Sequence, residues 1–337
     1  MTRNAKAAVA FAVVSLFFRS AYAVEPSAPL TIHLVAGNPT VEVIGMMTSK
    51  KDILPNYGKA YVIEARRVDP CSEAASLLAS GAADIAVSCT GALINTNLKL
   101  HADLRVVADV AQNGVDGQNA IWYCVRDDSP IKTIQDLKGK TIGTSAYGTW
   151  TDLSMRVGMN KAGFDPKDAT VVQLPYSAME ASLREKKIDM MSVTPPFYQI
   201  AMAKGGVRVL FTAAEAQGRV QGLSLMARQS FLSDNPVRVQ AFFDDYYRFL
   251  RYTFDPKNRD EMIEIGSKLL NSPPDVEKTL WNTKDDFYRD PKGIPNIDAM
   301  KREMATLKDY NLIPSEVDLD KWVDLSFIQK AAVDDKH

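Results

Sequence analysis

The sequence predicts an α/β protein made of two similar lobes, each a mainly parallel sheet flanked by helices. Apolar strand patterns alternate with helical patterns from residue 31 to residue 227, which is typical of βαβα folds. The phrase at residues 73–91 also has a loose echo at residues 180–195, with Asp84 aligned on Asp189. Finally, a chain of 337 residues exceeds the usual size of one hydrophobic core.

The first lobe is expected to open with a buried strand at residues 31–37, where apolar residues dominate. Asp69 and Pro70 should start the helix of the repeated phrase, because Asp is a good N-cap and proline already has a helical φ. The other elements expected in this lobe are a helix at 41–54 and strands at 61–68, 84–88 and 104–110.

Two polar segments rich in Gly and Gln, residues 111–119 and 216–222, interrupt the alternation. We interpret the stretch between them as a second lobe inserted into the first, and the two segments as hinges. Ordinary surface turns are the alternative, because Gly and Asn favour turns anywhere. The elements expected in the second lobe are strands at 120–125, 141–145, 170–174 and 207–211, a helix at 151–162, and the repeated helix and strand. The second polar segment leads into a strand at 223–227, which belongs to the first lobe.

The chain turns helical after residue 229. Asn235 and Pro236 start a helix whose apolar residues recur at intervals of three and four, so that one face packs on a core. Pro314 introduces the last helix, and this extension should buttress the first lobe. Further helices are expected at 259–270, 274–287 and 297–310. The expected boundaries are a signal peptide at 1–23, a first lobe at 24–113 and 218–337, and a second lobe at 114–217.

The N-terminus has the pattern of a cleavable signal peptide. Arg3 and Lys6 precede an apolar run at residues 7–18, and residues 21–23 supply the small residues of a cleavage site. The run is shorter than the roughly 20 residues needed to span a bilayer, and no Cys follows the site to carry a lipid. We therefore expect a secreted, periplasmic protein that begins at Val24.

Charge and cysteine content exclude two classes of protein. The formal net charge of −1 becomes more negative once the basic residues of the signal peptide are removed, so nucleic acid is not the expected partner. The three cysteines are too few for a disulfide framework, and their number is odd. A bridge between Cys71 and Cys89 remains open, as do buried unpaired thiols at both positions and at Cys124.

Signatures of enzymes and metal sites are almost absent. The histidines follow no metal-binding spacing, and no cysteines are spaced as in a zinc site. The stretch at residues 143–148 fits neither a dinucleotide-binding nor a phosphate-binding loop. We therefore expect no metal, no cofactor and no enzymatic activity. A secreted hydrolase that uses Ser145 or Cys89 as nucleophile is kept as an alternative.

Hydroxyl, amide and glycine residues gather where expected strands pass into helices. The carboxyl ends of parallel strands meet at one edge of a sheet, so junctions from both lobes would face one shared cleft. A helix N-terminus presents free N–H groups and a partial positive charge, which bind anions without Lys or Arg. Simple N-capping is the alternative use of these residues. The junction residues assigned to a ligand site are Asn38, Thr40, Val41, Ser88, Cys89, Thr90, Gly91, Ser145, Gly148, Thr149, Thr151, Thr194 and Pro195.

Four larger residues complete the expected ligand site. Tyr147, Trp150 and Phe197 lie at or just after the junctions of the second lobe, where they could cover an organic group beside the bound anion. Trp150 could equally belong to the core. Arg219, in the second hinge segment, could reach a carboxylate across the cleft, and an exposed arginine without that role is the alternative.

The arrangement as a whole resembles a known family. Its features are the signal peptide, the inserted second lobe, the phrase of leucine and small residues with Gly81 and Asp84 ahead of a pocket strand, and the helical C-terminal extension. The chain resembles the substrate-binding proteins of ABC importers in the nitrate, taurine and alkanesulfonate group. That resemblance implies the two-lobed periplasmic-binding-protein fold of type II, with two hinge crossings. It also implies a ligand held between the lobes by residues 38–41, 88–91, 145–151 and Thr194.

Two departures from the family's pattern concern the ligand. Cys89 stands where a small residue without a thiol is usual, and the loop of the second lobe is heavier in aromatic residues. These departures put nitrate in doubt and favour a larger organic acid, such as a sulfonate or a phthalate-like aromatic carboxylate. The resemblance implies that a monomeric protein delivers this anion to an inner-membrane ABC permease. Relatives of this architecture also bind pyrimidines, so a neutral or cationic heterocycle is the alternative ligand.

Overall fold

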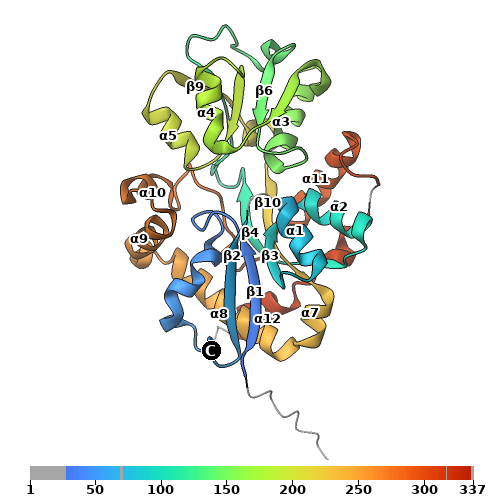
Figure 1. Ribbon diagram of the computed structural model, residues 1–337, viewed down its shortest axis with the longest axis vertical. Helices are drawn as coiled ribbons and strands as arrows, with labels where there is room; N and C mark the ends of the chain where they lie inside the picture. The colour runs from blue at the N-terminus through green and yellow to red at the C-terminus, as the bar shows by residue number, and fades with distance from the viewer. Residues whose placement is uncertain (1–27, 69–70, 316, 335–337) are drawn as a thin grey trace, which may run out of the picture.

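The computed structural model describes residues 28–68, 71–315 and 317–334 and contains two five-stranded sheets, each the centre of one lobe (Figure 1). The expected signal peptide and the expected helix start at Asp69 and Pro70 lie outside the described residues. None of the helices described is both long and apolar enough to cross a membrane.

The first sheet has the strand order β2-β1-β3-β10-β4. β1 pairs in parallel with β2 and β3, whereas β10 is antiparallel to both of its neighbours. β10 enters this sheet after the chain has passed through the other lobe. The strands are β1 (Leu30–Ala36), β2 (Tyr61–Arg67), β3 (Ile85–Ser88), β4 (Leu104–Asn113) and β10 (Val220–Arg228).

The second sheet repeats this arrangement with the order β7-β6-β8-β5-β9. β6 pairs in parallel with β7 and β8, and β5, which follows directly on β4 of the first sheet, is antiparallel to both of its neighbours. The predicted α/β fold with two equivalent sheets is therefore confirmed. The strands are β5 (Trp122–Arg126), β6 (Thr141–Thr144), β7 (Thr170–Gln173), β8 (Met190–Val193) and β9 (Val207–Thr212).

Helices connect the strands within each lobe, as the alternating pattern predicts. The first lobe has α1 (Cys71–Ser80) and α2 (Thr90–Leu100). The second lobe has α3 (Trp150–Lys161), α4 (Tyr176–Arg184), α5 (Phe197–Ala203) and α6 (Ala213–Gln217), with short 3-10 turns η2 (Ile134–Leu137) and η3 (Pro166–Asp168).

The first connection differs from its prediction, because the expected helix at 41–54 is the 3-10 helix η1 (Val43–Ile53) with a kink at Lys50. Lys50 has a φ of −123°, which is not helical. Its ammonium group binds the carboxylates of Asp52 at 3.1 Å and Glu261 at 2.9 Å. These contacts favour the kinked backbone over the regular helix that local propensity allows.

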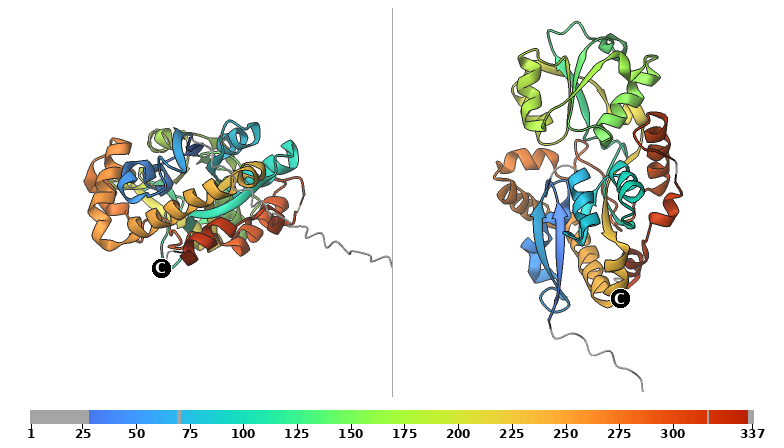
Figure 2. Two further views of the ribbon diagram at one scale, coloured as in Figure 1. Left: turned by 90° about the horizontal axis from the view of Figure 1, so that it is seen from below. Right: turned by 45° about the vertical axis from the view of Figure 1, so that its right-hand side comes forward.

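The C-terminal extension packs mainly on the first lobe (Figure 1; Figure 2). Its longest helix, α8 (Pro236–Phe254), buries Phe242, Phe243 and Tyr246, so the expected core face is confirmed. α11 (Ile297–Asp309) differs, because it contacts α2 and β10 of the first lobe and α3 of the second. The other elements are α7 (Gln229–Asp234), η4 (Pro256–Asn258), α9 (Arg259–Leu270), α10 (Pro274–Leu280), η5 (Leu319–Trp322) and α12 (Ser326–Asp334).

The helix expected at 274–287 ends at Leu280, and an irregular segment replaces its last two turns. The Arg289 guanidinium donates to both carboxylate oxygens of Asp286, at 2.8 and 3.0 Å, and both side chains are buried. Asp286 also accepts the N–H of Asn282 at 2.8 Å. Charge-assisted hydrogen bonds of this kind are stronger than the helical bonds that they replace.

Candidate functional site

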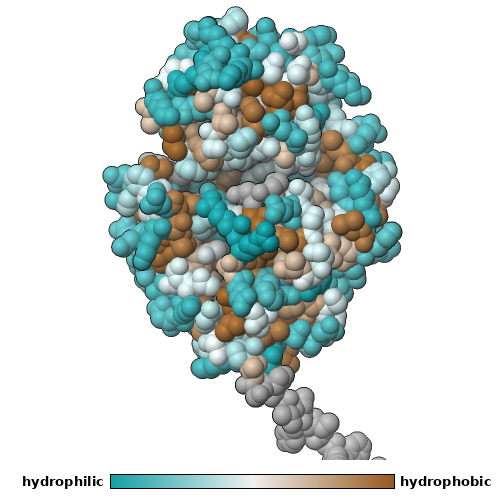
Figure 3. Space-filling view, viewed as in Figure 1, coloured by the Kyte–Doolittle hydropathy of each residue, from teal (hydrophilic) through white to brown (hydrophobic). Residues whose placement is uncertain are grey.

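A cavity of about 460 Å³ lies between the two lobes, beyond the carboxyl ends of β1 and β2 on one side and of β6, β7 and β8 on the other. The molecular surface is hollowed at this level (Figure 3). Open α/β sheets bind ligands at this edge. The cavity is lined by Asn38, Val41, Glu42, Arg67, Cys71, Ser145, Thr149, Trp150, Pro175, Tyr176, Ser177, Thr194, Pro195, Phe197, Leu223 and Phe287.

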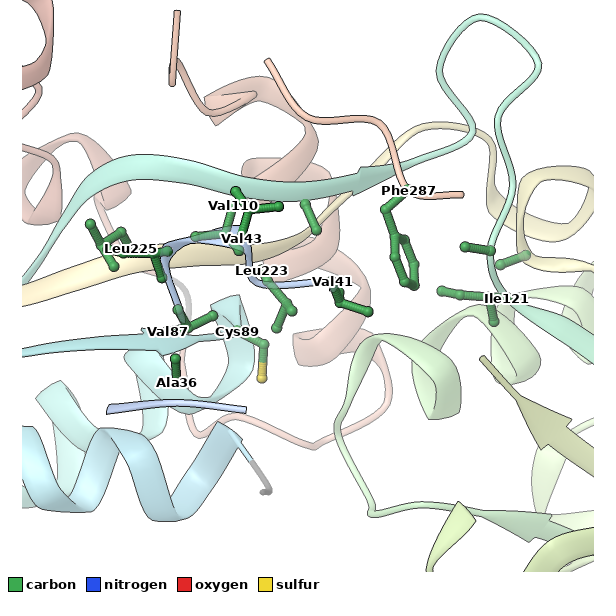
Figure 4. Packing of buried hydrophobic residues seen from close by; sticks show 14 of the residues in the cluster. Ala36, Val41, Val43, Val87, Cys89, Val110, Ile121, Leu223, Leu225 and Phe287 are labelled. Atoms are coloured by element: carbon green, nitrogen blue, oxygen red, sulfur yellow. The ribbon is translucent and has the colours of Figure 1, made fainter. Parts of the chain in front are cut away.

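The turn after β1 forms one wall of the cavity, with the amide side chain of Asn38 and the apolar side chain of Val41. The Asn38 side-chain oxygen accepts the N–H and the hydroxyl of Thr40, both at 3.0 Å, which fixes the turn. Arg289 donates to the carbonyls of Thr40 and Val41 at 2.7 and 3.1 Å and so fastens the turn to the segment around Phe287. Val41, Leu223 and Phe287 consequently point into one space between the lobes (Figure 4).

Two charged side chains of the first lobe reach the cavity. Arg67 is the last residue of β2 and is exposed, and among the described residues no carboxylate forms an ion pair with it. Glu42 precedes η1, is buried, and accepts the N–H of Gly37 at 2.5 Å. The cavity therefore presents a guanidinium free to bind an anion and a carboxylate that is held by the backbone.

The second lobe contributes a cluster of hydroxyl groups. The Thr151 hydroxyl lies 3.3 Å from that of Ser145 and 3.0 Å from that of Thr149. Burial raises the pKa of the Tyr176 phenol, whereas the adjacent hydroxyls of Ser145, Thr151 and Thr194 lower it. Tyr176 is therefore a neutral hydroxyl donor beside this cluster, and it can bind an anionic oxygen.

Two helices of the second lobe begin at the cavity. Thr149 is the N-cap of α3, and its hydroxyl accepts the N–H of Asp152 at 3.5 Å. Pro175 is the N-cap of α4 and has no side-chain hydrogen bond, so the first N–H groups of that helix are not capped by a side chain. Helix N-termini carry partial positive charge, which favours an anion at this wall.

Aromatic rings cover the rest of the cavity. Trp150 at the start of α3 stacks on Phe287 of the C-terminal extension, with ring centroids 4.8 Å apart and an interplanar angle of 23°. Tyr176 and Phe197 form a second pair at 5.8 Å. A Cβ atom on Gly222 would lie 2.0 Å from the Trp150 ring, so this glycine makes room for the indole between the lobes. Trp150 thus lines the cavity and also joins the two lobes.

The cavity brings together eight of the residues that the sequence assigned to a ligand site. They are Asn38, Val41, Ser145, Thr149, Trp150, Thr194, Pro195 and Phe197. Four others line a neighbouring cavity of about 410 Å³ that shares Cys71 and Thr149 with the first: Cys89, Gly91, Tyr147 and Gly148. A Cβ atom on Gly91 would lie 3.0 Å from the Gly148 carbonyl oxygen, so the lobes approach closely here.

The remaining five assigned residues line neither cavity, and their side chains bind other groups of the protein. Ser88 donates to the Cys71 carbonyl at 2.8 Å, and Thr90 to the Glu303 carboxylate at 2.9 Å. Thr40 and Thr151 are buried in the turn and the hydroxyl cluster described above. Arg219 donates twice to the Gln112 side chain, at 3.0 and 2.7 Å, because β4 and β10 are neighbours in the first sheet.

Sequence reasoning did not identify Glu42, Arg67, Tyr176 or Phe287 as lining residues. Arg67 carried a usable signal, because it is a charged residue at the carboxyl end of an expected strand. Phe287 carried no comparable signal, because this residue fell inside an expected helix. Among the described residues, no three His, Cys, Asp or Glu side chains are grouped to hold a metal ion.

Comparisons with known proteins identify a family and several relatives. A family model described as NMT1/THI5 like matches residues 64–258, more than half of the chain. A putative aliphatic sulfonates-binding protein from Escherichia coli is 24% identical over 219 residues, which cover 63% of this chain and 66% of the relative. A second putative aliphatic sulfonates-binding protein, from Bacillus subtilis, is 23% identical over 221 residues, which cover 64% of this chain and 64% of the relative. Each match spans slightly less than two thirds of the relative's length.

Solved structures share the fold. The periplasmic aliphatic sulphonate binding protein SsuA from Escherichia coli has a TM-score of 0.70 at 17% identity, covering 88% of this chain and 92% of its own. The periplasmic nitrate-binding protein NrtA from Synechocystis PCC 6803 has a TM-score of 0.72 at 15% identity. The match covers 91% of this chain and 89% of the NrtA chain. The desulfurization enzyme DSZB has a TM-score of 0.66 at 14% identity. The match covers 91% of this chain and 100% of the DSZB chain.

Proposed function

Because this chain belongs to the NMT1/THI5-like family, we propose that it is the solute-binding protein of an ABC importer. It captures a small organic anion between two hinged lobes and delivers it to an inner-membrane permease. In this proposal the lobes are residues 24–113 with 218–337, and residues 114–217. The protein works as a periplasmic monomer after its signal peptide is removed. The sulfonate-binding and nitrate-binding proteins among its relatives and structural neighbours support this class of function.

The observation that carries the proposal is the chemistry of the cavity's two walls. Arg67 stands on one side without an ion-pair partner among the described residues, and the N-termini of α3 and α4 begin on the other. An anion placed between them would meet a guanidinium, free N–H groups and hydroxyls at once. Closure of the lobes excludes water, and hydrogen bonds to a charged group then contribute roughly 1.5 to 3 kcal/mol each.

The proposed ligand is a sulfonate or an aromatic carboxylate of the phthalate type. Its organic part would lie against the stacked pairs of Trp150 with Phe287 and Tyr176 with Phe197. The volume of about 460 Å³ is within the usual range for small organic ligands and far larger than a nitrate ion requires. The apolar cover supports an organic acid rather than a bare inorganic anion.

Glu42 favours a second candidate, a neutral or cationic nitrogen heterocycle. Its buried carboxylate lies in the same lining as the two aromatic pairs. A carboxylate can accept N–H groups of a protonated ring that stacks on Trp150. For this ligand Glu42→Gln should abolish binding and Arg67→Ala should not, whereas the reverse is expected for an anion.

A hydrolase that uses Cys89 is disfavoured by the positions of the described histidines. His33 bonds to Asp84 near the start of β3, and Cys89 follows the other end of that strand, roughly 17 Å away at about 3.3 Å per residue. His101 is the C-cap of α2, whose N-cap is Cys89, so the helix separates them by roughly 18 Å. Neither imidazole can reach the thiol as a general base. This argument removes Cys89 as the nucleophile and leaves Ser145 as the alternative. We propose binding without turnover, which unchanged ligand recovered after incubation with the protein would support.

The proposal is tested by calorimetry and thermal shift on the mature protein. The panel is benzenesulfonate, phthalate, methanesulfonate, taurine, nitrate and a pyrimidine. We expect saturable binding of an organic anion at micromolar concentration, with a rise in melting temperature that grows with ligand concentration. If no anion of the panel binds while the pyrimidine does, the second candidate replaces the first. If none of these compounds binds, the assignment of the ligand class is wrong.

A further inference from the structure

Two of the three cysteines meet at the edge of the ligand cavity. Cys71 is the first residue of α1, and Cys89 is the N-cap of α2 directly after β3. In a strand-helix-strand unit, the start of the helix and the end of the next strand lie at the same edge of the sheet. The Ser88 hydroxyl ties the two segments together by its 2.8 Å hydrogen bond to the Cys71 carbonyl.

The two thiols are neighbours and are not equivalent. Interaction with the Cys71 thiol lowers the pKa of Cys89, and the same interaction raises the pKa of Cys71. The N–H of Ala92 in the first turn of α2 lowers the pKa of Cys89 as well, while the nearby Glu42 carboxylate raises that of Cys71. Cys89 is therefore the sulfur that ionises first, with a protonated thiol beside it.

Cys71 is partly exposed and Cys89 is buried, and both residues line the cavity of about 410 Å³ described above. A reagent that enters this cavity therefore meets both residues. The Cys89 sulfur points away from Val87 and Leu225, toward the space between the lobes (Figure 4). The third cysteine is different, because Cys124 is buried in β5 and its burial raises the pKa of its thiol to about 12.

We propose that Cys71 and Cys89 are a modification site, at which exchange with an oxidising disulfide compound joins them in a disulfide. The Cys89 thiolate attacks one sulfur of the compound and expels the first thiol, leaving a mixed disulfide on Cys89. Cys71 then loses its proton, attacks the Cys89 sulfur and expels the second thiol. The protein gives up two protons and two electrons, which convert one small disulfide into two thiols.

Such a disulfide would close the loop of residues 71–89, which contains α1 and β3. A closed loop lowers the entropy of the unfolded chain, so the oxidised protein should melt at a higher temperature than the reduced one. The bond would also hold the Cys71 sulfur, which lines the ligand cavity, in one place. This inference concerns the free protein and does not depend on which ligand the cavity binds.

The test starts from fully reduced protein incubated in its native state with glutathione disulfide. Thiols are then counted after denaturation, the mass is measured, and the linked peptides are mapped. We expect three thiols before oxidation and one after, a mass lower by two hydrogens, and a single link between Cys71 and Cys89. Oxidation should also raise the melting temperature. Three thiols that survive excess oxidant, or a link that includes Cys124, would overturn the proposal.

Single variants test the order of the two steps. Cys71→Ser should trap the first step, with one glutathione attached to Cys89. Cys89→Ser should gain glutathione on Cys71 at least several-fold more slowly, because burial and the Glu42 carboxylate still raise the pKa of the Cys71 thiol in this variant. Cys124→Ser is the matched control and should still lose two thiols on oxidation. Equal rates at Cys71 and Cys89 would contradict the assigned roles, and the thiol count of the wild type tests the disulfide even if a variant fails to fold.

Discussion

The carboxylate of Asp84 accepts the main-chain N–H of His33 at 2.9 Å, and the N–H of Asp84 donates to the His33 carbonyl, also at 2.9 Å. The second lobe repeats this reciprocal pair. There the Asp189 carboxylate accepts the N–H of Thr141 at 2.9 Å, and the Asp189 N–H donates to the Thr141 carbonyl at 2.7 Å. The two aspartates aligned by the sequence echo therefore have equivalent roles. Asp84 joins the start of β3 to β1, and Asp189 joins the start of β8 to β6.

We predict that Asp189→Ala lowers the free energy of unfolding by about 1 to 3 kcal/mol, because the Thr141 N–H loses its acceptor. Asp84→Ala should cost more, since Asp84 also pairs with Arg228 at 2.7 Å. Urea unfolding measures both changes. Asp260→Ala is the control, because the Asp260 side chain is 93% exposed and its change should be negligible. Equal stabilities of the three variants would show that the paired aspartates do not join the strands.

The sequence echo was informative because it records a contact that both sheets need. The alternation of strands and helices follows from local patterns, which is why the two-lobed α/β fold could be predicted. The failures arose where distant residues decide the backbone. The backbone is kinked at Lys50, whose side chain binds Glu261, and the helix expected at 274–287 stops at Leu280, ahead of the segment in which Arg289 binds the carbonyls of Thr40 and Val41. Neither partner is visible in the local pattern.

The candidate site was predictable to the extent that strand ends determine it. Residues such as Ser145, Thr149 and Thr194 line the cavity because parallel strands end at one edge. The direction in which each side chain points could not be predicted. Thr90, for example, was assigned to the ligand site, but its hydroxyl donates to the Glu303 carboxylate. Phe287 could not be found at all, since an irregular segment brings it to the cavity. The assigned ligand contacts stay predictions until a ligand is bound.

Arg67→Ala should weaken the binding of an organic anion by about ten- to a hundredfold, because one charged hydrogen-bonding partner is lost. The neighbouring Arg66 provides the matched control. Arg66 lies 3.6 Å from Glu73 and does not line the cavity, so Arg66→Ala should leave the dissociation constant nearly unchanged. Isothermal titration calorimetry with benzenesulfonate measures both. Equal losses for the two variants would mean that only general surface charge matters.

Trp150→Ala should discriminate between ligands by their organic part. Binding of benzenesulfonate should fall about tenfold more than binding of methanesulfonate, because only the aromatic ligand loses a stacking surface. Comparing two ligands removes any common effect of losing the stack on Phe287. Tyr147→Ala is the control, since Tyr147 belongs to the same loop but does not line this cavity. The same loss for both sulfonates would place the aromatic ring of the ligand elsewhere.

Stability should fall as pH rises from about 4.5 to about 7, and Glu303 is one source of this loss. The buried Glu303 carboxylate accepts the Gln221 N–H at 2.6 Å and the Thr90 hydroxyl at 2.9 Å, yet desolvation raises its pKa from 4.5 to about 7. Burial likewise raises the pKa of Asp109 to about 7. A pKa higher in the folded than in the unfolded chain means that the folded state binds more protons within this window, so raising the pH favours unfolding.

Glu303→Gln tests this sign directly. An amide cannot ionise, and it can still accept the Gln221 N–H while donating to the Thr90 oxygen. The loss of unfolding free energy between pH 5 and pH 8 should therefore shrink by about 2 to 3 kcal/mol relative to the wild type. Some loss of unfolding free energy should remain in the variant, because the pKa of Asp109 is still raised. Glu73→Gln, on the exposed surface, serves as the control and should keep the wild-type profile. A Glu303→Gln profile identical to that of the wild type would show that Glu303 does not carry the raised pKa.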